Sequence, residues 1–378
     1  MQRLLMTLLL MFTASAAVAQ SGSAEIKAAI GRAVEGKAVP AVGILEIRNG
    51  RVSSETVWGV RQMGRPEPVQ VGDRWHIGSD TKAMTATLIA VLVEKGKLSW
   101  TARLDEMMPE LAASMDPSYR DVTLVDLLAH QSGLPENVDD EAYYHSFYDD
   151  PRPLIDQRTA YVARALTEKP VGEKRTERFY SNTGYILAGL IAERTMHRPY
   201  EELMQTYVFK PLGMRSASFR YVAGNPVGHV DGRPALAKFD ANADMLAPAG
   251  LAQMTLQDWA KFCIDQMNGA QGHGRLLKTE TYRLMQTNAG GAKNGLGWGV
   301  APSIAGLQGP VLTHVGSDGN WYAIVALFPQ TGNGALVVAN AADSMGGDAA
   351  TGALLRERIK QLGQPAAPAP APTPETGG

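Results

Sequence analysis

Strand-like patterns occur near both ends of this chain of 378 residues, and helical patterns fill the long segment between them. Near the N-terminus, residues 42–62 alternate apolar and polar side chains around Asn49-Gly50, a dipeptide typical of a tight β-hairpin turn. Near the C-terminus, short apolar stretches between 295 and 341 have the composition of strands. Because strands must pair to satisfy their backbone groups, the simplest assembly is one sheet built from both ends of the chain.

The predicted fold class is therefore α/β, of the α+β type, with a mostly antiparallel sheet flanked by helices and a largely helical lobe beside it. The sheet lobe is assigned to residues 25–78 and 290–363, and the helical lobe to 84–285, within one domain that spans 20–363. A binding cleft is expected between the lobes. Residues 83–93 (AMTATLIAVLV) are apolar nearly all round, which predicts a central buried helix.

The first residues have the pattern of a secretory signal peptide. Arg3 precedes an apolar run at 4–12, and Ala17-Val18-Ala19 provides a cleavage site. We therefore predict a signal peptide over 1–19 and a secreted, periplasmic protein without stable membrane insertion. An uncleaved membrane anchor is the alternative, although the apolar run is short for a bilayer span. At the other end, the Pro- and Ala-rich residues 364–378 are predicted to form a disordered tail.

The composition argues against several partners and cofactors. With a formal net charge of -2, the chain has no strong basic field that would attract nucleic acid or anionic lipid. Cys263 is the only cysteine and lies in a helical pattern, so we predict a buried structural thiol and no disulfide. The histidines lack metal-ligand spacing and no Gly-rich phosphate loop follows a strand, so neither a metal nor a cofactor is expected.

Ser79 and Lys82 form an S-x-x-K pattern at the start of the apolar helical segment. Residues i and i+3 of a helix share one face, so the Lys82 amine is expected beside the Ser79 hydroxyl. A serine hydroxyl becomes a strong nucleophile when a neighbouring base accepts its proton, and lysine can be that base if burial lowers its pKa. A simple helix cap is the alternative for this motif taken alone.

Tyr180 and Asn182 lie in a loop just before another apolar helical segment. Tyr180 could transfer a proton if a nearby cation such as Lys82 depressed its pKa. The Asn182 amide could hydrogen-bond a substrate carbonyl or Lys82. A helix-capping loop is the alternative.

His314, Gly316 and Ser317 lie where a strand runs into a Gly-rich turn. Gly316 permits close approach of the backbone to a substrate, and the Ser317 amide could donate to an oxyanion. An ordinary strand end with a solvated histidine is the alternative.

Taken together and in this order, the three motifs resemble those of the serine β-lactamase and penicillin-binding protein superfamily. The resemblance is closest to the branch of class C β-lactamases, DD-carboxypeptidases, D-aminopeptidases and family VIII esterases, a peptidase S12-like group. The phrases WHIGSDTKAMTATLIA (75–90) and LLAHQSGLP (127–135) fit that branch, and the likeness extends over residues 25–361. It implies a β-lactamase/transpeptidase-like fold with the active site between the two lobes.

The resemblance implies a role for each motif residue. Ser79 would attack a carbonyl carbon and become acylated, while Lys82 and Tyr180 would transfer protons to the leaving group and from the attacking water. How these two residues share the protons stays open. Asn182 would orient the substrate and Lys82. The expected activity is that of a serine hydrolase that cleaves an amide or ester bond through an acyl-enzyme.

The third motif would complete the site. The backbone amides of Ser79 and Ser317 would form the oxyanion hole, with Gly316 beside them. His314 occupies the position where β-lactamases of this branch usually have lysine, and it would contact the transition state or a substrate carboxylate.

Two departures from the resembled β-lactamases narrow the expected substrate. A neutral His314 is a weaker carboxylate anchor than lysine, and the stretch after the last strand supplies Asp343 and Asp348 but no Arg or Lys. We therefore expect a small molecule or short peptide with an ester or amide carbonyl, and only weak β-lactam hydrolysis. A true class C-like β-lactamase and a penicillin-binding or sensor module that is acylated without turnover are the alternatives.

Two further segments allow more than one interpretation. His130 and Ser132 are either a second nucleophile–base pair or, as we prefer, part of a structural loop. Four aromatic residues of the following loop either line the substrate pocket or pack within the loop: Tyr143, Tyr144, Phe147 and Tyr148.

Overall fold

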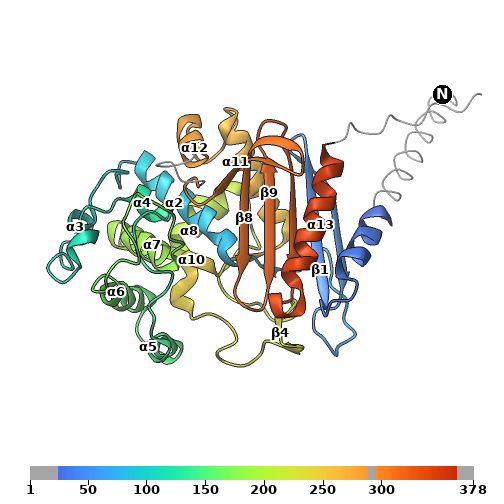
Figure 1. The fold of residues 1–378 in the computed structure, drawn as a ribbon, viewed down its shortest axis with the longest axis horizontal. Helices are drawn as coiled ribbons and strands as arrows, with labels where there is room; N and C mark the ends of the chain where they lie inside the picture. The colour runs from blue at the N-terminus through green and yellow to red at the C-terminus, as the bar shows by residue number, and fades with distance from the viewer. Residues whose placement is uncertain (1–23, 288–293, 364–378) are drawn as a thin grey trace, which may run out of the picture.

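The computed structural model describes residues 24–287 and 294–363, so the predicted signal peptide (1–19) and tail (364–378) lie outside the described residues. Six strands form one antiparallel sheet in the order β2-β1-β10-β9-β8-β7 (Figure 1). The N-terminal strand β1 therefore pairs with β10, the last strand of the chain, and β2 lies at the edge beside β1. The strands are β1 (Ala41–Arg48), β2 (Arg51–Gly59), β7 (Gly299–Ile304), β8 (Leu307–Ser317), β9 (Tyr322–Phe328) and β10 (Asn333–Ala339).

The β1–β2 hairpin turns at Asn49 and Gly50, whose φ angles of 51° and 71° are both positive, as the Asn-Gly dipeptide predicts. On its other side β1 pairs with β10, where Ile44 lies opposite Val337. This pairing joins the two ends of the chain, and the predicted antiparallel sheet built from both ends is confirmed.

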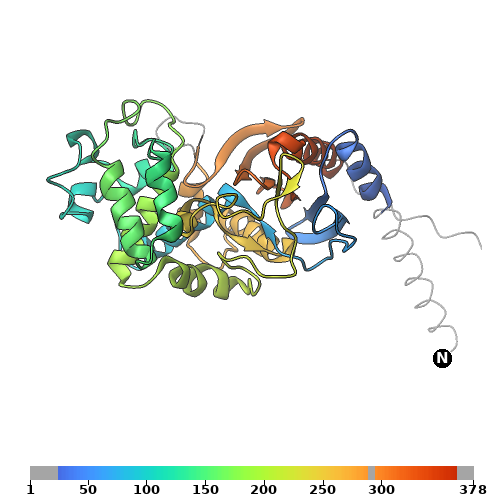
Figure 2. The ribbon, with the colours of Figure 1, turned by 90° about the horizontal axis from the view of Figure 1, so that it is seen from below.

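The outer face of the sheet is covered by the helical residues 24–34 and by α13 (Gly347–Leu362). Both helices pack along the sheet side of the molecule, away from the helical lobe (Figures 1 and 2). Their apolar side chains form one buried cluster with the outward side chains of the central strands, including Ile30, Val337 and Leu354. Burial of this face holds the N-terminal and C-terminal segments together.

The inner face of the sheet packs on α11 (Leu256–Ala270), which contacts β1, β2 and β9. This helix belongs to the 84–285 segment assigned to the helical lobe, but its apolar face, which includes Trp259, Phe262 and the buried Cys263, needs a cover that the sheet provides. The expectation of a buried Cys263 thiol is confirmed.

At the centre of the molecule lies α2 (Thr81–Glu94), which is buried at every residue from Thr81 to Leu92. A hydrogen bond from Gln266 Nε2 to Thr87 Oγ1 (3.4 Å) links α11 to α2. The prediction of a central buried helix at 83–93 is confirmed. Such a helix can hold a polar side chain in a fixed, water-poor place near its start.

The helical lobe lies on the side of α2 that faces away from the six-stranded sheet (Figures 1 and 2). The elements of the lobe are α3 (Leu104–Met107), α4 (Leu124–Leu128), α5 (Glu141–Ser146), α6 (Leu154–Ala165), α7 (Asn182–Met196), α8 (Tyr200–Met204), α9 (Lys210–Leu212), α10 (Ala247–Gly250) and α12 (Thr279–Met285). Two-residue strands form two further small sheets, β3 (Trp75–His76) with β6 (Gln253–Met254), and β4 (His229–Val230) with β5 (Arg233–Pro234). Within 24–287 and 294–363, no helix is both long enough and apolar enough to span a membrane.

Candidate active site

Ser79 lies in the short 3₁₀ turn η1 (Gly78–Asp80) between β3 and α2, directly beside the end of β8. Two glycines make this approach possible. A Cβ on Gly316 would lie 2.0 Å from the Ile77 carbonyl oxygen and 2.9 Å from the Ser79 amide nitrogen. A Cβ on Gly78, which has a φ of +50°, would lie 2.5 Å from the Ser317 amide nitrogen. The amides of Ser79 and Ser317 are therefore neighbours across this junction, as an oxyanion hole requires.

The Lys82 amine lies in the first turn of α2 and contacts three oxygens. Its Nζ is 2.9 Å from Ser79 Oγ, 2.7 Å from Asn182 Oδ1 and 2.7 Å from the Ala249 carbonyl oxygen. The side chain is fully buried. The Ala249 carbonyl, from α10, is a partner that the sequence motifs do not reveal.

Burial lowers the pKa of Lys82 to about 7, because the charged amine is poorly solvated there. Glu136 and Asp80 oppose this shift, and the charge of Arg178 adds to it. In its neutral form the amine has two protons and one lone pair. The Asn182 and Ala249 oxygens accept the two protons, which leaves the lone pair for the Ser79 hydroxyl proton. This geometry fits a general base.

Tyr180 lies in the loop before α7, and its hydroxyl donates to Ser79 Oγ at 2.7 Å. The Lys82 amine lies 4.7 Å from the centroid of the Tyr180 ring. Burial nevertheless raises the pKa of Tyr180 to about 12, with the hydrogen bond to Ser79 acting in the opposite direction. The lowered pKa of Tyr180 considered from the sequence is therefore not found, because desolvation of the phenolate outweighs the hydrogen bond to Ser79 and the charge of Arg178. Tyr180 is a proton donor at neutral pH, while Lys82 can be neutral.

Asn182 is the first residue of α7, and the capping of this helix positions it. The Ser181 hydroxyl accepts from the Gly184 amide at 2.9 Å and donates to the Pro135 carbonyl at 2.7 Å. The Asn182 side-chain amide donates to Asn137 Oδ1 at 3.1 Å, which turns its carbonyl oxygen toward Lys82. The capping loop considered as the alternative for this motif is present, and the same cap positions the Asn182 side chain.

His130 packs with its imidazole ring against the ring of Tyr180. It is buried, its Nδ1 accepts from the Ser181 amide at 3.0 Å, and its ring lies 4.6 Å from the Tyr180 ring centroid. Ser132 Oγ instead accepts from the Leu134 amide at 3.3 Å. These contacts favour the structural-loop interpretation of the 130–135 segment. Burial also lowers the pKa of His130 well below its usual range, so the ring packs as a neutral group.

His314 lies on β8 and lines a cavity of about 260 Å³ together with Tyr180, Thr313 and Arg178. Its Nδ1 is 2.9 Å from the Val315 carbonyl oxygen, which identifies Nδ1 as the protonated nitrogen. Desolvation in the cleft lowers the pKa of His314, and the charges of Lys82 and Arg178 lower it further. The ring is therefore uncharged at neutral pH.

Arg178 is a residue of this site that sequence reasoning missed. Its guanidinium carbon lies 5.2 Å from the centroid of the Tyr180 ring. The only signal in the sequence is its position two residues before Tyr180, which places both side chains on the same side of an extended segment.

A second cavity, of about 320 Å³, is lined by Asn182, Ala249 and Ser317. The acidic side chains of Asp139, Asp140 and Glu141 also line it. Of the four aromatic residues named above, Tyr144 lines this cavity, whereas Phe147 is buried and packs on Tyr161. The aromatic loop therefore contributes both to the cleft and to its own packing.

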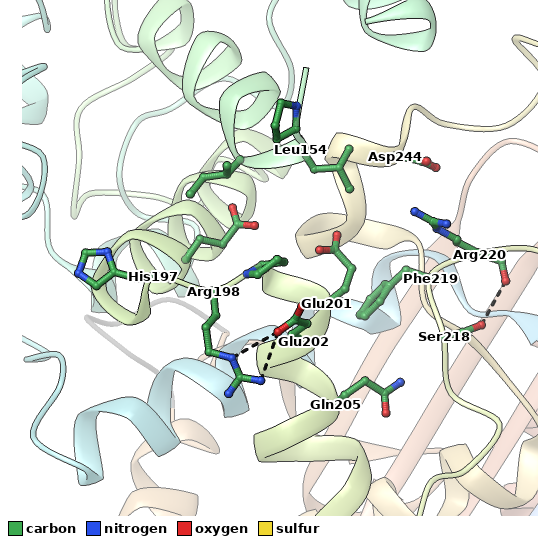
Figure 3. Close-up of a pocket in the computed structure, with 14 residues that line it drawn as sticks. Leu154, His197, Arg198, Glu201, Glu202, Gln205, Ser218, Phe219, Arg220 and Asp244 are labelled. Atoms are coloured by element: carbon green, nitrogen blue, oxygen red, sulfur yellow. Dashed lines mark hydrogen bonds and ion pairs between the residues drawn. The ribbon is translucent and has the colours of Figure 1, made fainter. Parts of the chain in front are cut away.

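A larger cavity of about 610 Å³ lies elsewhere, among α6, α7 and α8 (Figure 3). Arg198 and Glu202 are paired on its wall, and Phe219 contributes an apolar surface. None of the described residues that line it belongs to the three motifs, so size alone does not mark the catalytic cleft. Across 24–287 and 294–363, no group of three His, Cys, Asp or Glu side chains is placed to hold a metal ion.

Comparison with known proteins relates the chain to a family and a fold. Among curated proteins, the chain is 24% identical over 313 residues to Protein flp of Staphylococcus aureus (strain MW2), which covers 80% of this chain and 60% of that protein. It is 28% identical over 173 residues to Penicillin-binding protein 4* of Bacillus subtilis (strain 168), which covers 45% of this chain and 36% of that protein. The chain thus spans about 60% or less of the length of these relatives.

Among solved structures, the octameric penicillin-binding protein homologue from Pyrococcus abyssi superposes with a TM-score of 0.71 at 23% sequence identity, covering 90% of this chain and 77% of that chain. This likeness shows the fold, and the predicted β-lactamase/transpeptidase-like architecture is confirmed. A family model described as Beta-lactamase matches residues 26–359, which is most of the chain. The protein therefore belongs to the beta-lactamase family, within the superfamily of serine β-lactamases and penicillin-binding proteins.

Proposed function

We propose that the protein is a serine hydrolase that cleaves an amide or ester bond through an acyl-enzyme on Ser79. The observation that supports this most directly is the contact between Ser79 Oγ and the buried Lys82 amine at 2.9 Å. With a pKa of about 7, a large fraction of this amine is neutral at physiological pH. It can then accept the hydroxyl proton as the nucleophile attacks.

In the proposed acylation step, Ser79 Oγ bonds to the substrate carbonyl carbon and its proton moves to Lys82 Nζ. The carbonyl oxygen becomes an oxyanion beside the amides of Ser79 and Ser317. When the tetrahedral intermediate collapses, the bond to the leaving group breaks and the leaving group takes a proton. Tyr180, which donates to Ser79 Oγ and remains protonated, can pass that proton on and recover one from Lys82.

In deacylation, water attacks the same carbonyl carbon, and its proton goes to the neutral Lys82 amine or through Tyr180. The bond between the carbonyl carbon and Ser79 Oγ then breaks, the proton taken from water passes from Lys82 Nζ to Ser79 Oγ, and the acid is released. Asn182 keeps the Lys82 amine in place throughout, through its contact at 2.7 Å.

We further propose that short esters and peptides are better substrates than β-lactams, as expected for a peptidase- or esterase-like member of the family. The support is chemical. The uncharged His314 lacks the positive charge of lysine, and the segment after β10 offers Asp343 and Asp348 instead of a basic residue. Export through a signal peptide over 1–19 to the periplasm also remains a proposal, and the N-terminal sequence of the mature protein would test it.

Labelling with a fluorophosphonate probe tests the nucleophile. Mass spectrometry should locate the label on Ser79, and Ser79→Ala should lose both label and activity. Ser132→Ala is the matched control. Because this buried serine belongs to a structural loop, the variant should still be labelled on Ser79 to the same extent. If Ser79 stays unlabelled, or if Ser79→Ala remains fully active, the proposal is wrong.

A panel of substrates separates the proposal from its alternatives. Short p-nitrophenyl esters, D-amino-acid amides, D-Ala-D-Ala peptides and nitrocefin should be compared as kcat/KM. Continuous turnover of an ester or peptide supports a hydrolase, whereas one stoichiometric burst that then stops would indicate a sensor module. Nitrocefin hydrolysis as fast as the best ester would indicate a true β-lactamase.

A further inference from the structure

The catalytic cleft contains few groups that could hold a negative charge on a substrate. The Lys82 amine already forms hydrogen bonds with Ser79, Asn182 and Ala249. The His314 ring, which lines the cavity beside Tyr180, is uncharged and donates its Nδ1 proton to its own strand. Neither group is therefore available as a lasting cation for a carboxylate.

Arg178 differs from both. Its side chain is exposed to solvent, lines the same cavity as His314 and Thr313, and lies over the ring of Tyr180. Since the Tyr180 hydroxyl contacts Ser79 Oγ at 2.7 Å, a single tyrosine ring separates the guanidinium from the nucleophile. The cavity that Arg178 and Tyr180 line, of about 260 Å³, has room for a substituent of a substrate bound at Ser79.

The neighbouring basic residues show why Arg178 is different. Arg175 bonds Asp126 and Asp121, with nitrogen–oxygen distances of 2.7 and 3.1 Å, and Lys174 bonds Asp121 at 2.5 Å. In the described part of the chain, Arg178 forms no ion pair with a carboxylate. The planar guanidinium is held by the Tyr180 ring, and its hydrogen-bond donors are left for a ligand. Such a fork matches the two oxygens of a carboxylate.

A surface arginine that simply packs on an aromatic ring is the plainer explanation. Packing on the ring alone does not explain how Arg178 acts on other groups of the cleft. Its charge lowers the pKa of Lys82, His130 and His314. The guanidinium is exposed, yet it lines the same cavity as His130, Tyr180 and His314. An anion bound there would be attracted by the same charge.

We propose that Arg178 binds a carboxylate of the substrate close to the scissile bond, so that the enzyme favours anionic esters or amides over their neutral counterparts. This inference rests on the proposed function of Ser79. The carboxylate can belong to the leaving group, as at the C-terminus of a peptide, or to the acyl group, as in the monoester of a dicarboxylic acid. The chemistry of recognition is the same in both cases.

Protection of Ser79 from the fluorophosphonate probe tests the proposal without requiring turnover. Two matched pairs of competitors differ only in charge: N-acetyl-D-alanyl-D-alanine with its C-terminal amide, and monomethyl with dimethyl succinate. For the wild-type protein, the anionic member of at least one pair should protect Ser79 at about 10- to 100-fold lower concentration, the value of one charge-assisted hydrogen bond. The pair that responds identifies the side of the scissile bond that bears the carboxylate.

Variants then assign the effect to Arg178. In Arg178→Gln this preference should disappear, in Arg178→Lys a part of it should remain, and in Arg178→Glu it should reverse. Arg51→Gln, at an exposed arginine at the start of β2, is the matched control and should keep the full preference. Added salt should weaken the wild-type preference, because the guanidinium is exposed.

The outcomes separate the two proposals. If the probe never labels Ser79, the proposed function itself has failed. If the probe labels Ser79 but neither anionic competitor protects better than its neutral partner, the role of Arg178 is wrong while the nucleophile stands. A preference that persists in Arg178→Gln also overturns it, since another cation must then bind the carboxylate.

Discussion

The chemistry proposed for this cleft depends on the charge of one residue, Lys82. Its amine is fully buried between Ser79, Asn182 and Ala249, and that burial lowers its pKa to about 7. Tyr180 lies equally close to Ser79, but its pKa is raised to about 12. Two groups with pKa values moved in opposite directions provide one base and one acid at the same pH.

The first prediction concerns the pH dependence of catalysis. The deprotonated Lys82 amine is the active form, so kcat/KM for a short activated ester should rise with pH and level off above an apparent pKa of about 7. Lys82→Arg should lower kcat/KM by about 100- to 10,000-fold, because a guanidinium stays protonated. A pH–rate series from 5 to 9 would measure both. An unchanged rising limb in Lys82→Arg would contradict the assignment.

The second prediction separates the two candidate proton acceptors. Tyr180→Phe removes the hydrogen bond to Ser79 Oγ at 2.7 Å but leaves Lys82 and its surroundings in place. We expect kcat to fall by about 10- to 100-fold, the effect of one lost hydrogen bond to a developing charge. The rising limb near pH 7 should persist. Loss of that limb in Tyr180→Phe would show that Tyr180, not Lys82, is the titrating base.

At the scale of secondary-structure elements, the site depends on the approach of β8 to η1. Gly316 has no positive φ, so its role is purely steric: any Cβ there would meet the Ile77 carbonyl oxygen at 2.0 Å. This distance is impossible for real atoms, so a side chain would push β8 away from the start of α2. The amides of Ser79 and Ser317 would then separate.

The third prediction follows from that contact. Gly316→Ala should lower the free energy of unfolding by about 1–3 kcal/mol, as for other overpacked sites, and should slow acylation of Ser79 strongly. Gly31→Ala is the matched control, because a Cβ at this helical glycine meets nothing within 4 Å and should slightly stabilise the helix. Thermal melting and the rate of fluorophosphonate labelling would check both. A Gly316→Ala protein that is acylated at the normal rate would contradict the steric argument.

Several elements could be predicted from local sequence patterns, and others could not. Asn49-Gly50 predicts its hairpin because both residues tolerate positive φ angles, and the apolar 83–93 run predicts α2 because only a central helix can bury all its faces. The packing of α11 on the sheet was missed, since an amphipathic pattern shows that a face is buried but not which partner covers it. The Ala249 carbonyl beside Lys82 has no sequence signal, because every residue has a carbonyl.

At the scale of the whole molecule, the cleft brings together segments that are far apart in the chain. Lys82 is separated from Asn182 by 100 residues and from Ala249 by 167. The motifs predict through family resemblance that Lys82 and Asn182 act together, and nothing in the sequence predicts the Ala249 carbonyl. The fold places all three groups within hydrogen-bond distance. Arg178 and the raised pKa of Tyr180 could not be predicted in this way, because both depend on the three-dimensional surroundings of the loop before α7.

Because the whole fold buries Lys82, its ionisation is coupled to global unfolding. In the unfolded chain its pKa is about 10.4, whereas in the folded protein it is about 7. Between these values the unfolded state binds more protons than the folded state, so stability rises with pH. Below pH 7 the amine is charged in both states, so the free energy of unfolding no longer changes with pH through this group and has its lowest value. The catalytic base thus lowers the stability of the fold most at acidic pH.

The last prediction tests this linkage with Lys82→Met, whose unbranched side chain is one atom shorter and cannot ionise. Relative to the wild type, the variant should be most stable at pH 6–7, and its advantage should decrease by about 1.4 kcal/mol per pH unit from pH 7 toward pH 10. Loss of the donors to Asn182 and Ala249 shifts all values equally and does not alter the slope. Urea unfolding at several pH values would measure the difference, with Lys97→Met, at an exposed lysine just after α2, as the flat control. A difference that is independent of pH would mean that Lys82 stays charged in the folded protein, and the proposed base would have to be abandoned.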